Sequence, residues 1–282
     1  YISFSQKMIC MELKGKLENL RNFLSSFENA VVAFSGGVDS ATLSAICKEV
    51  ISDVLAVTIC STATPSREIE GAKKVAKEIG VTHRFINVDI LSVQGFVDNS
   101  EMRCYYCKKF LMKTISDFAS TKGYEVVFEG SNASDLQTHR PGYRAIVECE
   151  KVFSPWAKFG VTKEEIRAIA KSMGFSFYNT PSLACLATRI PFGVKISMEK
   201  LKMIDEAENS VIGIADVGSV RVRYLDGFAV VEVEKNEISK VFEKRREIKS
   251  ALMKLGFKGV FINPQGYRSG VFVKKIDDLL EI

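Results

Sequence analysis

Short apolar runs and helical stretches alternate along the first part of the chain. Apolar residues recur every three or four positions over 11–27 and 38–50, and a proline and a glycine frame a further helical stretch at 65–79, so we expect helices there. The runs between them are rich in β-branched residues and predict buried strands at 31–34, 54–59, 84–88 and 126–129. Strands that alternate with helices predict a doubly wound parallel sheet of the α/β class.

The pattern changes in the last third of the chain. A stretch with two prolines and a glycine, 180–193, predicts a connection to a second unit. Beyond it, we expect a helix, two strands, a long charged helix and a strand, at 198–209, 219–224, 228–234, 238–255 and 259–262. We therefore predict two domains, 8–195 and 196–282, the second a small α+β domain.

Six residues join the first predicted strand to its helix: Ser35, Gly36, Gly37, Val38, Asp39 and Ser40. Glycines let the backbone turn sharply and let a ligand approach the amides. The first N–H groups of a helix lack internal partners, and the helix dipole is positive there. We therefore expect an anion site at this turn, with serine hydroxyls as further donors. It is not a Walker A loop, because the Lys-Ser/Thr ending is missing from the sequence.

Two further positions are expected beside this loop. In a doubly wound sheet, ligands bind beyond the carboxyl ends of the strands. Thr58 lies at the carboxyl end of the second predicted strand, and Gly130 follows the fourth. The turn 58–64 is therefore a candidate wall for a nucleotide base.

Composition and charge narrow the class of ligand. Apolar residues make up 46% of the chain and charged residues 26%, which is ordinary for a globular protein. The net charge of +5 fits a polyanionic small molecule but is too small to argue for nucleic acid. The sequence has no apolar run of membrane-spanning length, and its seven cysteines are an odd number, which argues against a disulfide scaffold. We expect a cytoplasmic protein without a membrane partner.

Two cysteines carry a second kind of chemistry. Cys104 and Cys107 are three residues apart, so both thiols would face one side of a helix. A second such pair, which a four-cysteine zinc site needs, is missing, and Cys185 is the remaining candidate. Three thiolates can hold a [4Fe–4S] cluster with one iron uncovered for an exogenous sulfide. Packing or a redox dithiol is the alternative for the pair, and packing is favoured for Cys10, Cys47, Cys60 and Cys149.

The loop from Ser35 to Ser40 resembles the signature of the PP-loop ATP pyrophosphatases. Further motifs follow it in order at 104–108, 129–135, 140–142, 185–193, 220–223 and 266–270. Taken together, these motifs resemble those of the LarE family of ATP-dependent sulfur transferases. The resemblance runs over nearly all of the chain from Met11 onward.

This resemblance implies a reaction. Members of the family use ATP to adenylate a carboxylate of pyridinium-3,5-biscarboxylic acid mononucleotide and replace oxygen with sulfur, on the way to the nickel-pincer nucleotide cofactor. Some members sacrifice a cysteine sulfur, and others carry three cysteines like cluster-dependent thiolases. The trio of Cys104, Cys107 and Cys185 implies the cluster branch and a separate sulfide source, with Cys185 as sacrificial donor in the alternative. The resemblance also implies a homo-oligomer, a trimer or a hexamer.

Named residues can be given roles in that reaction. Asp39 and Asp135 are candidate ligands of the Mg²⁺ that accompanies ATP, and helix capping is a compatible role for Asp39. Lys108 is a candidate contact of the α-phosphate or the acyl-adenylate, the alternative being a solvated lysine. We expect catalysis to rest on Cys185, Lys108 and Asp39.

Arginines are the candidates for binding the substrate. Arg221 and Arg223 are two apart on a predicted strand and so project to one face, and their planar forks match phosphate geometry. A solvated strand face is the alternative. Further candidates are Arg189 and Arg268 for the same phosphate, and Arg140 and Arg144 for a substrate carboxylate or pyrophosphate.

Three other functions stay open at this point. A PP-loop tRNA thiolase can share a three-cysteine cluster, although the sequence shows no dense basic stripe. An adenylating ligase that uses ammonia would not need the cysteines. A nucleotide-binding module would not release pyrophosphate.

Overall fold

The computed structural model describes residues 4–136, 141–181, 184–268 and 279–282, with side chains from residue 11 onward. The chain divides into two compact units. The first unit comprises Tyr1–Val93 and Met102–Leu183, and the second comprises Gln94–Glu101 and Ala184–Ile282. Each unit has its own sheet and its own core.

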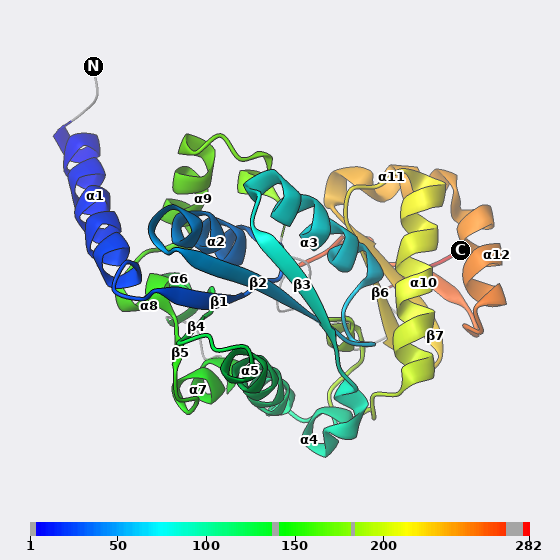
Figure 1. The fold of residues 1–282 in the computed structure, drawn as a ribbon. Coiled ribbons are helices and arrows are strands. Elements are labelled where there is room, and N and C mark those ends of the chain that lie inside the picture. Colours follow the sequence, from blue (N-terminus) through cyan, green and yellow to red (C-terminus); the bar gives the residue numbers. More distant parts are fainter. Residues whose placement is uncertain (1–3, 137–140, 182–183, 269–278) are drawn as a thin grey trace. The chain divides into compact units, whose positions relative to one another are not determined.

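A five-stranded parallel sheet forms the centre of the first unit (Figure 1). Its spatial order is β3-β2-β1-β4-β5, and the strands are β1 (Asn29–Ala33), β2 (Asp53–Cys60), β3 (Thr82–Asn87), β4 (Val127–Phe128) and β5 (Val152–Phe153). The predicted α/β class is therefore confirmed. Strand β5 is absent from the predicted strands, because its apolar run, Val152-Phe153, is only two residues long and is flanked by polar residues.

Both faces of this sheet are covered by helices, as a parallel sheet requires. On β1, Ala30 and Val32 enter one apolar core, together with side chains from α1 (Phe4–Leu24), α2 (Val38–Val50), α3 (Ser66–Ile79) and α9 (Lys163–Ser172). Val31 points the other way, into a core formed with α5 (Arg103–Thr121) and α7 (Pro141–Val147). The short elements of this unit are η1 (Ile90–Ser92), α6 (Ala133–Leu136), α8 (Pro155–Lys158) and η2 (Ser176–Asn179).

The second unit is an α+β fold built on a mixed sheet of order β6-β7-β8-β9. Its strands are β6 (Val220–Leu225), β7 (Phe228–Val233), β8 (Val260–Ile262) and β9 (Leu280–Glu281); β7 and β8 are parallel, and the other neighbours are antiparallel. Its helical elements are α4 (Gln94–Val97), η3 (Leu186–Arg189), α10 (Met198–Ala215), η4 (Lys235–Glu237), α11 (Ile238–Glu243) and α12 (Arg245–Lys254). Apolar residues of α10, α11 and α12 pack together with the strands.

Two predicted helices in this unit had wrong bounds. The helix expected at 198–209 continues to Ala215, because Val211 and Ala215 are buried against the sheet, and it ends at Asp216 in the left-handed conformation. The helix expected at 238–255 is divided at Lys244, whose backbone leaves helical geometry. The sequence carries neither proline nor glycine there, and nothing in the structure explains the break. No described helix is long and apolar enough to cross a membrane.

Helices α5 and α7 are joined at the surface by a polar cluster. The Tyr105 hydroxyl donates to Glu148 Oε2 at 2.7 Å, and Lys109 Nζ contacts both the same oxygen, at 3.0 Å, and the Tyr105 oxygen, at 3.1 Å. Arg144 adds a contact to Glu148 Oε1 at 3.2 Å. These donors, the Tyr105 hydroxyl first, lower the pKa of Glu148 to about 2.

This cluster predicts a shift in acid unfolding. Because the folded pKa of Glu148 is depressed, its stabilising contribution is complete above the unfolded pKa of about 4.3 and is lost as the pH falls toward about 2. Tyr105→Phe removes the largest cause, so the carboxyl should protonate at higher pH, and acid unfolding followed by circular dichroism should begin at higher pH. Tyr106→Phe, at the adjacent surface tyrosine, is the control. Identical acid limbs for Tyr105→Phe and wild type would contradict the assignment.

Candidate functional site

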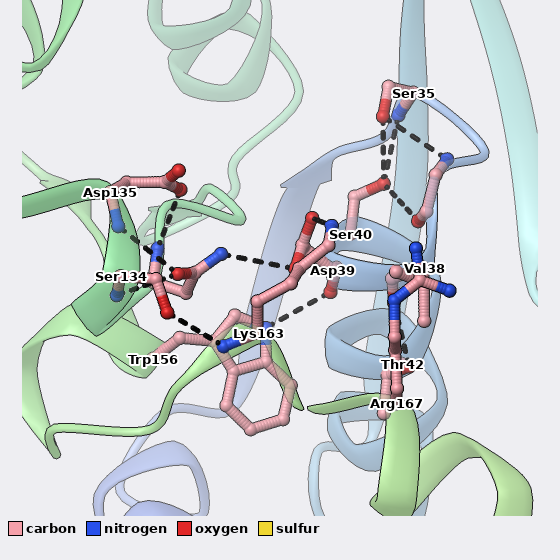
Figure 2. A network of polar contacts seen from close by, with 12 residues as sticks. Ser35, Val38, Asp39, Ser40, Thr42, Ser134, Asp135, Trp156, Lys163 and Arg167 are labelled. Carbon is pink, nitrogen blue, oxygen red and sulfur yellow. Dashed lines mark hydrogen bonds and ion pairs between the residues drawn. The ribbon is translucent and has the colours of Figure 1, made fainter. Parts of the chain in front are cut away.

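The loop predicted to bind an anion leaves the carboxyl end of β1 and enters α2 (Figure 2). The Ser40 hydroxyl donates to Gly37 O at 3.2 Å and accepts from Ser35 N at 3.1 Å. The Ser35 oxygen accepts from Gly37 N at 3.3 Å. The two serines therefore fix the loop from within. Gly37, which caps α2, has no side chain to cover the first N–H groups of the helix, and this arrangement suits a phosphate.

Close packing of the backbone leaves no room for larger residues at two glycines. Gly36 has a φ of +76°, and a Cβ there would lie 2.6 Å from Cα of Ala72 on α3. A Cβ on Gly130 would lie 3.0 Å from Ser40 N. The loop is thus packed between α3 and the segment that follows β4. The glycines therefore serve close packing of the backbone, and the approach of a ligand to the loop amides stays a prediction.

Asp39, in the first turn of α2, is the centre of a polar network (Figure 2). Its carboxylate forms an ion pair with Lys163 and accepts from Asn132 Nδ2 at 3.2 Å. Trp156 Nε1 donates to its carbonyl at 3.0 Å. Burial raises the pKa of Asp39, and the contacts with Lys163 and Asn132 oppose that rise. Four segments of the first unit therefore meet at Asp39, three of them at its carboxylate.

Asp135 lies near this network. One of its carboxylate oxygens accepts from Asn132 N at 3.1 Å, and its charge contributes to raising the pKa of Asp39. Carboxylate oxygens are the ligands that Mg²⁺ takes from proteins when it also binds nucleotide phosphates. The donor set of Asp39 and Asp135 therefore fits the cation that accompanies ATP, and Lys163 supplies a positive charge at Asp39 in this structure.

Thr58, at the predicted base wall, forms hydrogen bonds within the protein. Its hydroxyl donates to Phe34 O at 2.7 Å, so His83 Nε2, 2.8 Å away, donates to the Thr58 oxygen. Burial lowers the pKa of His83, which favours the neutral imidazole. These contacts join the carboxyl end of β1 to β2 and to the start of β3, and binding of a base by the turn 58–64 stays a prediction.

Cys104 and Cys107 lie in the first turns of α5, Cys104 exposed and Cys107 half-buried. Lys108, the next residue, is 3.4 Å from Oε2 of Glu129, a buried carboxylate at the end of β4. The hydroxyl and amide of Ser131 also donate to Glu129. Lys108 is therefore paired with a buried acid, and its role toward phosphate stays a prediction.

Four of the other substrate candidates lie in the second unit. Arg221 and Arg223 share one face of β6, as predicted, because both stack over the ring of Tyr267, at 5.2 and 6.0 Å. Arg189 is fully buried against Glu208. Arg268 is exposed and donates to a neighbouring glutamine, Arg144 belongs to the surface cluster on α7, and Arg140 lies outside the described residues.

The structure brings together the loop, Asp39, Asp135 and Gly130, and it places Lys108 with the two cysteines of α5 in the same unit. Cys185 belongs to the second unit, so the convergence of three sulfurs stays a prediction. Within either unit, no three His, Cys, Asp or Glu side chains among the described residues are grouped to hold a metal.

Sequence reasoning missed Lys163, Asn132 and Glu129. Lys163 follows Thr162, whose side chain caps α9 in a full capping box, so its sequence neighbourhood predicts a helix start and nothing more. Asn132 and Glu129 lie inside a motif quoted for the resemblance, yet their contacts join segments far apart in sequence. The signal that could have found them is their position after the fourth strand, at the ligand edge of the sheet.

Comparison with known proteins agrees with this geometry. A family model described as queuosine biosynthesis protein QueC matches residues 29–103, which include the loop. An uncharacterized protein of Synechocystis is 33% identical over 92% of this chain and 97% of its own length, and one of Methanocaldococcus jannaschii is 33% identical over 93% and 100%. The pyridinium-3,5-bisthiocarboxylic acid mononucleotide synthase of Lactiplantibacillus plantarum is 26% identical over 92% of this chain and 94% of its own.

The chain belongs to the LarE-like family of PP-loop proteins. As a PP-loop enzyme it uses ATP, and the loop of Ser35–Ser40 is the part of this chain that fits the phosphates. Asp39, at the end of that loop, fits the accompanying Mg²⁺. The acceptor of the adenylyl group belongs to the proposal below.

A pH test follows from the position of Lys163 at Asp39. Mg²⁺ binds the deprotonated carboxylate, so binding of Mg²⁺–ATP should weaken as the pH falls through the raised pKa of Asp39. Lys163→Met removes the positive charge that opposes this rise, so the acid limb of binding should move to higher pH. Calorimetric titration between about pH 5 and pH 8 measures the limb.

Lys171→Met is the matched control, because it removes a surface lysine from the other end of α9. Its acid limb should coincide with that of the wild type. If Lys163→Met also leaves the limb unmoved, the charge of Lys163 does not set the ionisation of Asp39.

Proposed function

We propose that this PP-loop enzyme is an ATP-dependent sulfurtransferase that acts on pyridinium-3,5-biscarboxylic acid mononucleotide. A substrate carboxylate oxygen attacks the α-phosphorus of ATP, pyrophosphate leaves, and a sulfide then replaces AMP at the carboxyl carbon to give the thiocarboxylate. This thiocarboxylate is a precursor of the nickel-pincer nucleotide cofactor. The proposal is supported by similarity along nearly the whole chain to the synthase of Lactiplantibacillus plantarum.

One set of contacts carries the proposal in this chain. Lys108, on the turn of α5 that holds Cys104 and Cys107, pairs with Glu129. The residue after Glu129 is Gly130, which packs against Ser40 of the phosphate loop. Cysteines and the loop therefore belong to one packed assembly within the first unit, which is what a reaction that joins nucleotide cleavage to sulfur chemistry needs.

The loop and its neighbours do the work of activation. The N–H groups at the start of α2 stabilise charge on the departing pyrophosphate, each well-placed donor contributing about 3–4 kcal/mol. Asp39 and Asp135 hold the cation, and Lys163 neutralises Asp39 when the cation is absent. Lys108 stabilises the negative charge of the acyl-adenylate. Arg221 binds the substrate phosphate, while Arg223 is engaged with Glu232 and the Thr188 carbonyl.

The raised pKa values of three described thiols argue against them as cluster ligands. Burial raises the pKa of Cys47, Cys60 and Cys149, which disfavours the thiolate that an iron–sulfur cluster requires. We propose Cys104, Cys107 and Cys185 as the ligands of a [4Fe–4S] cluster. When bound, the cluster supplies an open iron position that takes up and delivers sulfide.

Serine substitutions at the trio test the proposal. With Cys104→Ser, Cys107→Ser or Cys185→Ser, pyrophosphate should still be released in a single turnover, because the loop is untouched. Thiocarboxylate formation, measured by mass spectrometry of the product, should fall to background, as should iron and acid-labile sulfide after anaerobic reconstitution. Cys60→Ser, which changes a thiol outside the trio, should keep both activities.

The other outcomes are distinguishable. Intact turnover in all three serine variants would favour a ligase that uses ammonia and would overturn the sulfur chemistry. A wild-type chain lighter by one H₂S after turnover, with the loss at Cys185, would show sacrifice of that sulfur in place of cluster delivery. Binding of tRNA with a steep salt dependence would favour a tRNA thiolase.

A further inference from the structure

A buried ion pair lies directly beside Cys185 in the second unit. Arg189 and Glu208 are both fully buried, and they meet as two forks, Nε to Oε1 at 2.7 Å and Nη2 to Oε2 at 3.1 Å. Glu208 lies on α10, and its Oε1 also accepts from Val222 N on β6 at 3.0 Å. The carboxylate therefore ties α10 and β6 to the segment that carries the cysteine.

The third nitrogen of Arg189 is directed at the backbone of that segment. Nη1 donates to Ala184 O at 2.6 Å and to Cys185 O at 3.1 Å, and it contacts Thr188 Oγ1 at 2.9 Å. The Thr188 hydroxyl and amide donate to Cys185 O as well, at 2.8 and 2.9 Å. The Cys185 carbonyl is thus held by three donors, one of them charged.

A second buried pair also holds this turn. Arg223 Nη1 donates to Thr188 O at 2.8 Å, and its Nε donates to Glu232 Oε2 at 2.9 Å. Asn263 Nδ2 donates to the other oxygen of Glu232 at 3.1 Å. The turn after Cys185 is therefore attached through charged groups to α10, to β6 and, by way of Glu232, to β7.

Two buried ion pairs contribute little net stability to a fold. Removing two charges from water is expensive, and apolar residues of similar size often stabilise a core as well or better. A fully buried guanidinium whose three nitrogens all donate within the protein is also poorly suited to meet a substrate phosphate. What the pair does provide is a fixed backbone at Ala184 and Cys185.

We propose that the Arg189–Glu208 pair positions Cys185, by fixing the backbone from which this thiol is presented, and does not bind substrate. The proposal rests on the sulfurtransferase function for its purpose, because transfer of sulfur depends on where the sulfur is held to a fraction of an ångström. Arg189 is accordingly a positioning residue, in place of the phosphate ligand expected from the sequence.

The first measurement uses the full chain free of cluster, ATP and substrate, so that the thiols can react. Arg189→Lys keeps one positive charge but loses the fork, so the segment should open more often. Alkylation of Cys185 by N-ethylmaleimide, followed residue by residue by mass spectrometry, should become about fivefold faster or more, while that of Cys104 stays unchanged. With substrate and ATP, kcat for thiocarboxylate formation should fall while KM for the mononucleotide stays unchanged.

Two further variants keep the result interpretable. Thr188→Val removes the hydroxyl that bridges Arg189 and the Cys185 carbonyl at nearly constant volume, and it should also accelerate Cys185 alkylation, by a smaller factor. Val241→Ala opens a cavity in the core of the same unit, on α11, and controls for lost stability. It should leave the Cys185 rate at the wild-type value when the melting temperature falls as far as in Arg189→Lys.

The proposal is overturned if Cys185 reacts at the wild-type rate in both Arg189→Lys and Thr188→Val, or if Val241→Ala accelerates it equally. A raised KM with unchanged thiol reactivity would return Arg189 to the substrate phosphate. If the enzyme makes no thiocarboxylate while the alkylation pattern appears as expected, the proposed function fails and the positioning of Cys185 stands.

Discussion

A carboxylate withdrawn from water must find a partner, and the candidate site of this protein is built on that requirement. Asp39 meets Lys163, Glu129 meets Lys108, Glu208 meets Arg189 and Glu232 meets Arg223. In each pair the two residues come from different segments, so the electrostatic requirement also joins parts of the chain. The first two pairs surround the phosphate loop, and the last two surround the turn after Cys185.

This pairing separates the work of the two units. In the first unit the lysines of these pairs are partly open to solvent, with 27% of the Lys163 and 32% of the Lys108 side chain exposed. A ligand can therefore compete with the carboxylate for the lysine ammonium. In the second unit the Arg189–Glu208 pair is closed on both sides, and its hydrogen bonds go to the backbone. A partly open pair suits a binding site, because its carboxylate can take a metal ion, or its lysine a phosphate, in place of the present partner. A fully buried pair suits a structural role.

Local patterns in the sequence were enough to predict four of the five strands of the first sheet and the turn between β1 and α2. Strand β1 and helix α2 carry strong periodicity, and Gly36 and Gly37 mark the turn between them, so their positions follow from residues next to one another. Lys163 could not be found in this way, because its partner Asp39 is 124 residues away and its own neighbourhood predicts only a helix start. The burial of Arg189 was missed for the same reason: an arginine in a turn is expected in solvent until a distant Glu208 is known to face it.

The contact between Gly36 and Ala72 gives helix α3 a part in shaping the phosphate loop. With the backbones this close, the residue at position 72 acts as a spacer whose size sets how closely the loop approaches α3. A longer side chain at this position would lift the loop and turn its amides away from the phosphates, even with every residue of the loop itself intact. Tolerance to substitution on α3 should therefore be narrowest at a small apolar residue that a search for catalytic groups would pass over.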